Sequence, residues 1–417
     1  MRRILLATIA CCTFLVHSCI KDTCSSTYSY TYFVPVYKTS TEVRSNIKSN
    51  QPKEIERPGK LYIRGSFIFL NELDKGIHII DNSNPSNPRN VAFIDIPGNM
   101  DMAVKGNTLY ADLYTDLVSI DITNPLNTSV TKIVEGVFPR RFYNGHFMQD
   151  SSRVIVEWIE KDTTVTEDCN GGSWWEKDRG IVLNYAANSG GAGPAAVSPY
   201  GMGGSMARFA LASERLYAVG DSDLDVFNIS NPHNPSFVTN RAIGWGIETI
   251  YPFKDKLFIG STTGMFIYSI TNPDNPTQLG QFSHARSCDP VVADDTYAYV
   301  TLRSGTTCAG FSNQLDVIRL NNITNPSLVK TYPLTNPHGL SKDGNTLFIC
   351  DGKAGLKIYN AADVNNLQLI KTISGIETFD VIAWNNVAIV VATDGLYQYD
   401  YSDLNNITLL SKITVTK

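Results

Sequence analysis

Short stretches of alternating apolar and polar residues recur along the chain, and most of them lead into an Asn-Pro pair. Gly76–Asp81 precedes the pair that begins at Asn84, and Asp116–Asp121 precedes the pair that begins at Asn124. Alternation with a period of two predicts a β-strand, because successive side chains of a strand point to opposite faces. Proline after asparagine favours a turn, so each pair is expected to end a strand.

The pattern returns about every 40 residues. The Asn-Pro pairs begin at positions 84, 124, 231, 272 and 325, and Gly355–Tyr359 and Gly395–Asp400 repeat the strand without the proline. The first repeat predicts four strands, at Lys60–Arg64, Phe67–Leu70, Gly76–Asp81 and Val91–Ile96. A unit of about 40 to 45 residues with four short strands is typical of one β-propeller blade. The chain is therefore predicted to be all-β, with a single propeller over residues 59–417.

The interval between the second and third clear repeats is longer than one period. Arg153–Ile159 is predicted to be a second strand there and Gly180–Tyr185 a third, followed by a run rich in Gly, Ala, Pro and Ser from Ala186 to Ser205. We expect a degenerate repeat with an insertion at about 138–202. The propeller is then predicted to have seven or eight blades, and these residues favour eight.

The first residues have the pattern of an export signal. Arg2 and Arg3 precede an apolar stretch that is too short to span a bilayer, for which about 20 residues are needed. A small residue directly before Cys19 resembles a bacterial lipobox, so residues 1–18 are expected to be removed and Cys19 to carry lipid. Residues 19–58 would then be the lipidated N-terminus and tether of an outer-membrane protein that faces the periplasm or the cell surface. The alternative is an ordinary secretory signal cut near the same place.

The charge of the chain argues against nucleic acid as a partner. The formal net charge is −5, and removal of a signal with two arginines and no acidic residue changes it to −7. No basic cluster suited to a phosphate backbone is present. No later stretch is long and apolar enough to cross a bilayer, so lipid is the only membrane contact expected.

The cysteines and the motifs predict one disulfide and neither a cofactor nor a metal. Cys288 and Cys308 flank an insertion within one repeat and are the best candidates for a bond in an oxidising compartment. Cys350 lies within a predicted strand and is expected to be a buried thiol. The sequence contains no His-Glu-x-x-His metal motif, no phosphate-binding loop and no nucleophile elbow.

Superposition of the repeats places one ionisable residue of nearly every repeat at the start of the innermost strand, which lines the channel of a propeller. These residues are Lys60, Asp101, His146, Arg208, Glu248, Asp289, His338 and Asp380. Such a ring could bind a polar ligand or an ion. Alternatively, a hydrated channel simply tolerates polar side chains, and an alignment error of one residue would turn a side chain away.

Three tryptophans are candidate contacts for a partner. Trp174 and Trp175 lie in a polar loop, and Trp245 lies between Gly244 and Gly246 where an inner strand is expected to begin. Exposed indole rings stack on sugars or anchor a partner protein. The same residues could instead cap the edge of a blade.

The repeated strands resemble a known family. Gly76–Asp81, Leu117–Asp121 and Leu315–Arg319, with Ser/Thr-Asn-Pro after many copies, are similar to the LVIVD repeat. Over residues 59–417 the chain resembles the LVIVD-repeat β-propeller lipoproteins of Gram-negative-type bacteria. The resemblance implies an exported or surface-associated protein and carries over no catalytic residue.

These observations predict a lipid-anchored propeller of the cell envelope that binds or scaffolds a protein or a glycan, with no catalysis evident. The alternative is an enzyme acting on carbohydrate or another extracellular polymer, with Glu248 and Asp289 at the channel mouth and a mechanism set by the spacing of their carboxyl groups. A third hypothesis is a structural part of an envelope complex, which predicts an exposed apolar patch on the outside.

Overall fold

The computed structural model describes residues 25–138, 142–143, 146–147, 153–168, 202–284, 290–305 and 312–416. Apart from the short helix α2 (Ser40–Ser45), the elements of these residues are all β-strands. The chain divides into two compact units, residues 1–37 with 155–182, and residues 38–154 with 183–417.

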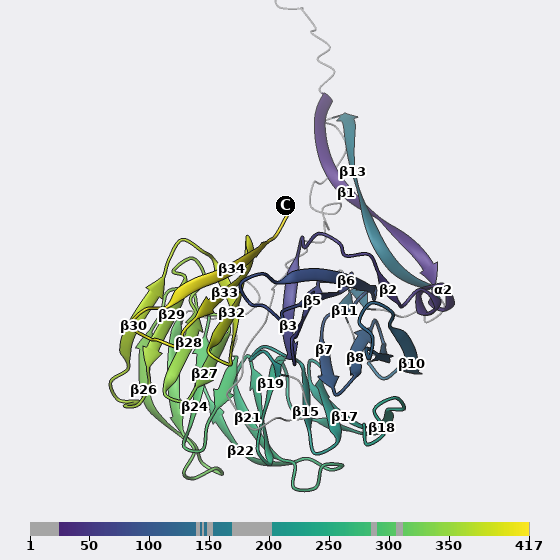
Figure 1. The fold of residues 1–417 in the computed structure, drawn as a ribbon. Helices are drawn as coiled ribbons and strands as arrows, with labels where there is room; N and C mark the ends of the chain where they lie inside the picture. The colour runs from purple at the N-terminus through teal and green to yellow at the C-terminus, as the bar shows by residue number, and fades with distance from the viewer. Residues whose placement is uncertain are drawn as a thin grey trace, which may run out of the picture. The chain divides into compact units, whose positions relative to one another are not determined.

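The described residues of the larger unit form seven four-stranded antiparallel blades in chain order (Figure 1). Blade 1 contains β3 (Pro58–Arg64), β4 (Phe67–Glu72), β5 (Gly76–Asp81) and β6 (Arg89–Asp95). Blades 2 and 3 contain β7 (Met102–Lys105), β8 (Thr108–Leu113), β9 (Asp116–Asp121) and β10 (Ser129–Val134), then β15 (Phe209–Ala212), β16 (Arg215–Val219), β17 (Asp223–Asn228) and β18 (Ser236–Ala242). Blades 4 and 5 contain β19 (Ile247–Phe253), β20 (Lys256–Ser261), β21 (Gly264–Ser269) and β22 (Thr277–Ser283), then β23 (Val291–Ala293), β24 (Tyr297–Leu302), β25 (Gln314–Arg319) and β26 (Ser327–Pro333). Blades 6 and 7 contain β27 (Leu340–Asp343), β28 (Thr346–Cys350), β29 (Leu356–Asn360) and β30 (Gln368–Ile373), then β31 (Thr378–Trp384), β32 (Val387–Ala392), β33 (Gly395–Asp400) and β34 (Thr408–Thr414).

The first strands of the blades form the inner ring of the propeller. Each contacts the first strand of the next blade, in the order β3, β7, β15, β19, β23, β27 and β31, and β31 contacts β3 again. The ring is therefore closed, and it has seven blades. All inner strands begin at one end of the ring, which we call the entry end. Because the strands alternate in direction, the turns between third and fourth strands lie at the opposite end, which we call the Asn-Pro end.

The Asn-Pro turns have the local chemistry that the sequence predicts. The side chain of Asn84 accepts a hydrogen bond from Ser86 N–H at 3.1 Å, and its carbonyl accepts one from Asn87 N–H at 2.8 Å. Asn124 and Asn272 repeat both contacts in blades 2 and 4. An asparagine that bonds the backbone two residues ahead stabilises a turn without help from the rest of the fold.

The expected eighth repeat is wrong. Arg153–Ile159, predicted to be the second strand of a blade, belongs to the long strand β13 (Arg153–Asp168), which pairs with β1 (Ser25–Thr39) in a two-stranded ribbon. The strand carries polar residues on both faces, whereas the second strands of the blades are almost wholly buried. It therefore cannot replace a buried blade strand. Gly180–Tyr185 lies outside the described residues.

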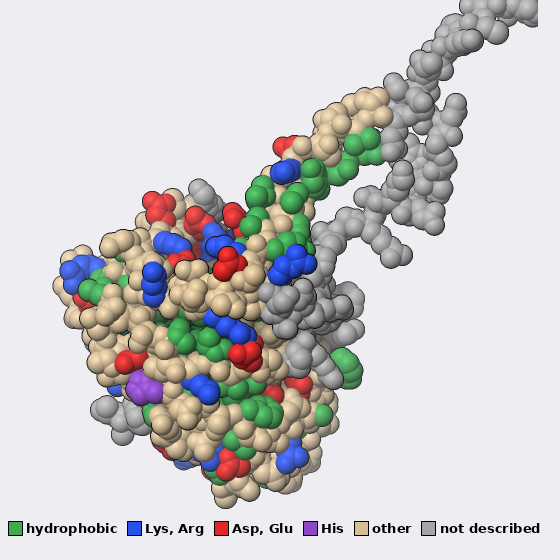
Figure 2. Space-filling view, turned by 90° about the vertical axis from the view of Figure 1, so that its right-hand side faces the viewer, with side chains coloured by type: hydrophobic (Ala, Val, Ile, Leu, Met, Phe, Trp, Pro, Cys, Tyr) green, Lys and Arg blue, Asp and Glu red, His purple; other side chains and the backbone are tan. Residues whose placement is uncertain are grey.

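The ribbon has one polar ladder and one aromatic ladder. Hydroxyls of β1 bond those of β13, as Thr27 with Thr166 at 3.0 Å and Ser29 with Thr164 at 2.9 Å. The intervening Tyr28 and Tyr30 stack with ring centroids 6.0 Å apart. Figure 2 shows hydrophobic side chains along the ribbon. In the larger unit, β11 (Phe142–Tyr143) and β12 (His146–Phe147) form a second, very short pair.

Part of the segment expected to be a tether packs against the blades. Arg44 of α2 forms an ion pair with Asp116 at 2.6 Å, and the two-residue strand β2 (Ser49–Asn50) extends blade 1 beyond β6. Ile55 is buried and forms a parallel bridge with Val415, next to the end of the last strand. Residues 38–57 therefore contribute to the core and to the closure of the ring.

Candidate functional site

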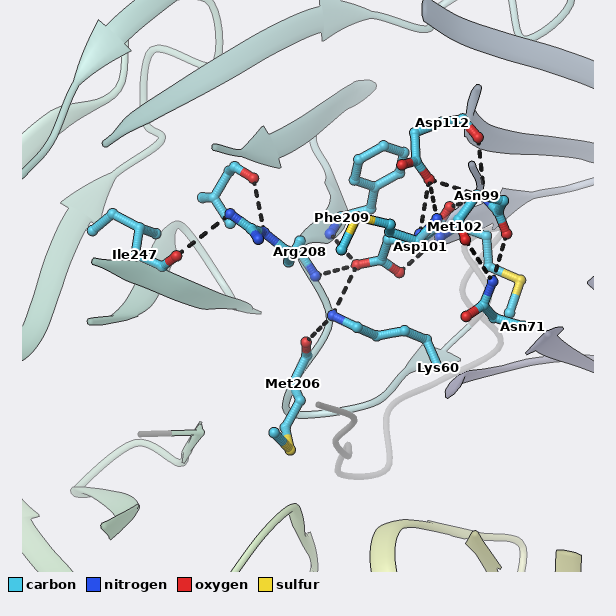
Figure 3. A network of polar contacts seen from close by, with 12 residues as sticks. Lys60, Asn71, Asn99, Asp101, Met102, Asp112, Met206, Arg208, Phe209 and Ile247 are labelled. Atoms are coloured by element: carbon cyan, nitrogen blue, oxygen red, sulfur yellow. Dashed lines mark hydrogen bonds and ion pairs between the residues drawn. The ribbon is translucent and has the colours of Figure 1, made fainter. Parts of the chain in front are cut away.

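Two of the predicted channel residues, Lys60 and Asp101, form a buried ion pair on the axis (Figure 3). Lys60 Nζ lies 3.6 Å from Asp101 Oδ2 and donates to the carbonyl of Met206 at 2.6 Å. The Asp101 carboxylate also accepts from three backbone N–H groups, those of Met102 at 2.7 Å, Phe209 at 3.1 Å, and Arg208. Burial raises the pKa of Asp101, and the Lys60 charge and the N–H groups act against that rise. The carboxylate therefore joins blades 1, 2 and 3.

Arg208 reaches the same cluster only through its backbone. Within blade 3 its guanidinium Nη2 donates to Asp221 Oδ1 at 2.9 Å. The same Nη2 donates to the carbonyl of Ile247 of blade 4 at 3.4 Å (Figure 3). Nε donates to the carbonyl of Val219 at 3.3 Å. Arg208 thus links two blades.

A chain segment crosses the axis beside this cluster. The strand β14 (Met202–Gly203) pairs with the inner side of β3, although these residues end a run predicted to be a flexible linker. Ser205 Oγ then accepts from Leu340 N–H of blade 6 at 3.2 Å, and the carbonyl of Ala207 accepts from Ile250 N–H of blade 4 at 2.8 Å. Residues 204–207 are buried. The segment therefore contacts blades on several sides of the ring, and Lys60 and Asp101 are shielded from solvent.

A buried amide network continues from Asp101 into blade 1. Asn71 Nδ2 donates to Asn99 Oδ1 at 2.7 Å, and Asn99 Nδ2 donates to Asp112 Oδ1 at 2.9 Å. Asp112 Oδ1 also accepts from the N–H of Asp101 at 2.8 Å. The sequence did not point to these residues, because Asn and Asp near strand ends have the composition of ordinary turns.

Asp380 is fully buried, and its surroundings disfavour its charged form. Its Oδ1 accepts from Val381 N–H at 2.7 Å, while Oδ2 has no hydrogen-bond partner among the described residues. Burial raises the pKa of Asp380 well above its ordinary value, and the nearby Lys60 charge opposes the rise. Asp380 is therefore a buried carboxyl of the core and is not open to a ligand.

Glu248, Arg303 and His338 form a second charged group, supplied by blades 4, 5 and 6. Glu248 occupies a bulge of β19 between Ile247 and Thr249. Burial lowers the pKa of Arg303, which follows β24, and the charge of Glu248 opposes that change. Arg303 was not predicted, since the repeat comparison considered only first strands. The sequence feature that could have identified Arg303 is a charged residue directly after an apolar second strand, at the entry end.

His338 lies in this group as a neutral imidazole. It is 4% exposed, and burial followed by the Arg303 charge lowers its pKa to about 3. Nε2 lies 3.2 Å from Asn336 Nδ2, and the ring meets Phe379 edge-on at 5.1 Å. Nδ1 is buried and has no hydrogen-bond partner in the described part of the chain.

Trp245 is held out at the entry end by its two glycines. Its side chain is 81% exposed. Gly246 has φ +70°, and a Cβ there would lie 2.2 Å from Thr262 Oγ1; a Cβ on Gly244 would lie 3.1 Å from the ring of Phe266. The backbone packs closely on blade 4 on either side, and at Gly246 both the positive φ and the close approach favour glycine. The indole is consequently presented to solvent three residues before Glu248.

The remaining candidates are only partly within the described residues. The backbone of His146 lies in β12, and its side chain is outside them, as are Cys19, Trp174, Trp175, Cys288, Asp289 and Cys308. Cys350 is a free, buried thiol as predicted, and burial raises its pKa. Among the described residues, no three metal-binding side chains converge and no helix could span a membrane.

The blades and the repeats together define the class of protein. The LVIVD repeat family matches residues 59–94, 98–134 and 216–241, which cover blade 1, blade 2 and most of blade 3. The chain is a seven-bladed β-propeller that carries LVIVD repeats.

Several solved structures are similar to this chain. The designed protein Ika8 matches with a TM-score of 0.51 and 9% identity, over 88% of this chain and 90% of its own. BamB from Moraxella catarrhalis matches with a TM-score of 0.46 and 11% identity, over 79% of this chain and 80% of its own. Sqt1 from Saccharomyces cerevisiae matches with a TM-score of 0.48 and 7% identity, over 87% of each chain. At these identities the likeness concerns the fold alone. A search among curated proteins finds no match.

Proposed function

We propose that the protein is a lipid-anchored binding module of the cell envelope, which holds a protein or glycan partner at the entry end of the propeller. The exposure of Trp245 carries the proposal. A tryptophan that is 81% exposed between two glycines loses no packing when a partner covers it, and it offers a large rigid apolar surface. Aromatic residues of this kind dominate the binding energy of many interfaces.

The neighbouring charged group gives the proposed site its polar contacts. Glu248 and Arg303 are half-buried at the same end, so a partner that covers the indole meets a carboxylate and a guanidinium there, while the buried His338 lies behind them. Arginine is a common partner of carboxylates and stacks well on planar groups. A protein side chain or an acidic sugar would both suit this combination.

Binding rather than acid–base catalysis is supported by the state of the two axial carboxyls. Asp101 is occupied by backbone N–H groups and Lys60, and Asp380 is fully buried, which raises its pKa. Neither of these two carboxyls is open to a substrate, and of the pair Glu248 and Asp289 the second lies outside the described residues. The proposed attachment through Cys19 follows from the lipobox-like pattern and places the module at the membrane.

The test is site-specific photo-crosslinking of the full-length chain in its native membranes. Position 245 is replaced with p-benzoylphenylalanine, and Leu409, which is similarly apolar and exposed on the outer strand β34, receives the same replacement as the control. We expect an adduct from position 245 and none from position 409. Protease sensitivity of the adduct identifies a protein partner, and glycosidase sensitivity identifies a glycan. Equal labelling at both positions, or none at 245, contradicts the proposal.

A further inference from the structure

The third residue of the second strand is aromatic in six of the seven blades. These residues are Phe69, Tyr110, Tyr217, Phe258, Tyr299 and Phe348, and all are buried. The hairpins that contain them pair in matching register, and in blade 7 the same position is Ile389. Blade 7 therefore lacks a ring that every other blade has.

The aromatic ring fills the seam between its own blade and the next. Tyr110 of blade 2 donates its hydroxyl to the carbonyl of Pro232, in the Asn-Pro turn of blade 3, at 3.0 Å. Tyr217 of blade 3 donates in the same way to Pro273 of blade 4, also at 3.0 Å. Phe348 of blade 6 packs edge-on against Tyr401 of blade 7 at 4.8 Å. In two of the seams, a six-membered ring thus lies beside a proline carbonyl.

At the seam between blades 7 and 1, a cavity of about 130 Å³ lies at this position. Its walls include Ile389, Val387, Trp384, Ile63, Phe67 and Pro85. Pro85 occupies the place in blade 1 that Pro232 and Pro273 occupy in blades 3 and 4. Isoleucine is smaller than a phenol ring, so the missing ring accounts for the space. Turn residues Gly65 and Asn385 also line the cavity, which places it at the Asn-Pro end.

We propose that this cavity binds a phenolic ring. An apolar cavity of roughly 150 Å³ is known to accept benzene, so the volume suits one ring. The Pro85 carbonyl accepts from Ser411 Oγ at 2.6 Å, and a carbonyl oxygen has two lone pairs, so it can also accept from a phenol hydroxyl as Pro232 and Pro273 do. Trp384 adds an aromatic wall. The site lies at the opposite end from Trp245 and does not depend on the function proposed above.

The test measures binding of 4-fluorophenol to the full-length protein by fluorine NMR. We expect p-cresol to displace it and 4-methylcyclohexanol, of similar size but without a flat ring, to compete poorly. Ile389→Phe supplies the missing ring from within, so it should weaken binding about tenfold or more while keeping or raising Tm. Leu409→Phe adds the same ring at an exposed position of blade 7 and should leave binding unchanged.

A second variant and a second competitor distinguish the remaining outcomes of the binding experiment. If Ile389→Phe does not fold, Ile389→Met, which reaches further into the cavity at similar volume, should also weaken binding. Displacement by a capped tyrosine tripeptide as well as by p-cresol indicates a partner's tyrosine, and displacement by p-cresol alone indicates a small phenol. No binding to the wild type, together with a higher Tm of Ile389→Phe, shows only a packing void and overturns the proposal. Binding that Ile389→Phe or Ile389→Met leaves unchanged lies elsewhere and overturns it too.

Discussion

Asn82 and Gln398 exchange two amide hydrogen bonds across the seam that closes the propeller ring. Asn82 Nδ2 donates to Gln398 Oε1 at 2.9 Å, and Gln398 Nε2 donates to Asn82 Oδ1 at 2.7 Å. The first and last blades share no strand, because blade 1 is built from β3–β6 and blade 7 from β31–β34. Closure of the ring therefore rests on side chains such as these and on the bridge between Ile55 and Val415.

Loss of one amide at the seam should destabilise the fold. Asn82→Leu leaves the fully buried Gln398 amide without this partner, which costs about 1 to 3 kcal/mol. The double variant Asn82→Leu with Gln398→Leu should recover part of the loss, since neither polar group then remains. Urea unfolding measures the free energy of unfolding of the single and the double variant. Gln368→Leu, on the exposed outer strand of blade 6, is the control and should stay within about 0.5 kcal/mol of the wild type. An equally small effect of Asn82→Leu would show that the pair does not hold the ring.

Asp101→Asn should be among the most damaging changes on the axis. The amide keeps the shape of the side chain but removes the charge that faces buried Lys60, and its NH₂ cannot accept from backbone N–H groups. Breaking a buried pair in this way costs about 3 to 5 kcal/mol. Asp221→Asn changes an exposed partner of Arg208 and should cost at most about 1 kcal/mol. Equal denaturant midpoints for Asp101→Asn and Asp221→Asn would contradict this prediction.

Asp380 should make stability depend on pH in an unusual direction. Burial raises its folded pKa above the ordinary value of 3.8, so its contribution to stability is fully present below that pH and is lost as the pH rises through the folded pKa. Asp380→Asn should therefore gain stability over the wild type as the pH is raised from acid to neutral. Urea midpoints across that range measure the difference. A stability difference between Asp380→Asn and the wild type that is the same at every pH would refute the raised pKa of Asp380.

Asp81 provides a control for that experiment, because its pKa is shifted in the opposite direction to that of Asp380. Hydrogen bonds from Ser83, followed by Arg89, lower the pKa of Asp81 to about 2. Its contribution is present above pH 3.8 and is lost as the pH falls towards 2. Asp81→Asn should therefore be less stable than the wild type at neutral pH, and the deficit should disappear on acidification.

Gly246→Ala should disturb the presentation of Trp245. Gly246 has φ +70°, and its added Cβ would meet Thr262 Oγ1 at 2.2 Å, so both strain and a clash follow. Gly344→Ala is the matched control, because Gly344 has φ +52° but nothing lies within 4 Å of the added atom. We expect Gly246→Ala to lose more than the roughly 1 kcal/mol typical of backbone strain alone. Thermal unfolding of the two variants gives the comparison, and equal losses would remove the role assigned to Thr262.

Attachment through Cys19 predicts a simple fractionation result. Cys19→Ala should move the protein from the membrane fraction to the soluble fraction, because Cys19 is the lipid acceptor that the lipobox-like pattern predicts. Cys24→Ala should leave it in the membrane. Release by the second variant, or retention of the first, would show that the anchor lies elsewhere.

The repeat period and the turn chemistry made the propeller predictable from the sequence. Asn84 and its counterparts stabilise turns through bonds to residues two or three positions away, and the strands alternate within six or seven residues, so neither depends on distant contacts. The same locality allowed the repeat comparison to place Lys60, Asp101 and Asp380 at the inner ring, and Cys350 in a buried strand.

Only the tertiary structure decided how distant segments meet. β13 pairs with β1 instead of completing an eighth blade, and residues 202–207 cross the axis, because these segments find partners more than a hundred residues away. Asp101 is shielded because residues 204–207 cross beside it, and its carboxylate accepts from N–H groups of blades 2 and 3. The small side chain of Ile389 likewise becomes a cavity only because the equivalent rings fill a seam with the next blade. Local pattern determines the elements, and contacts between elements determine what their side chains can bind.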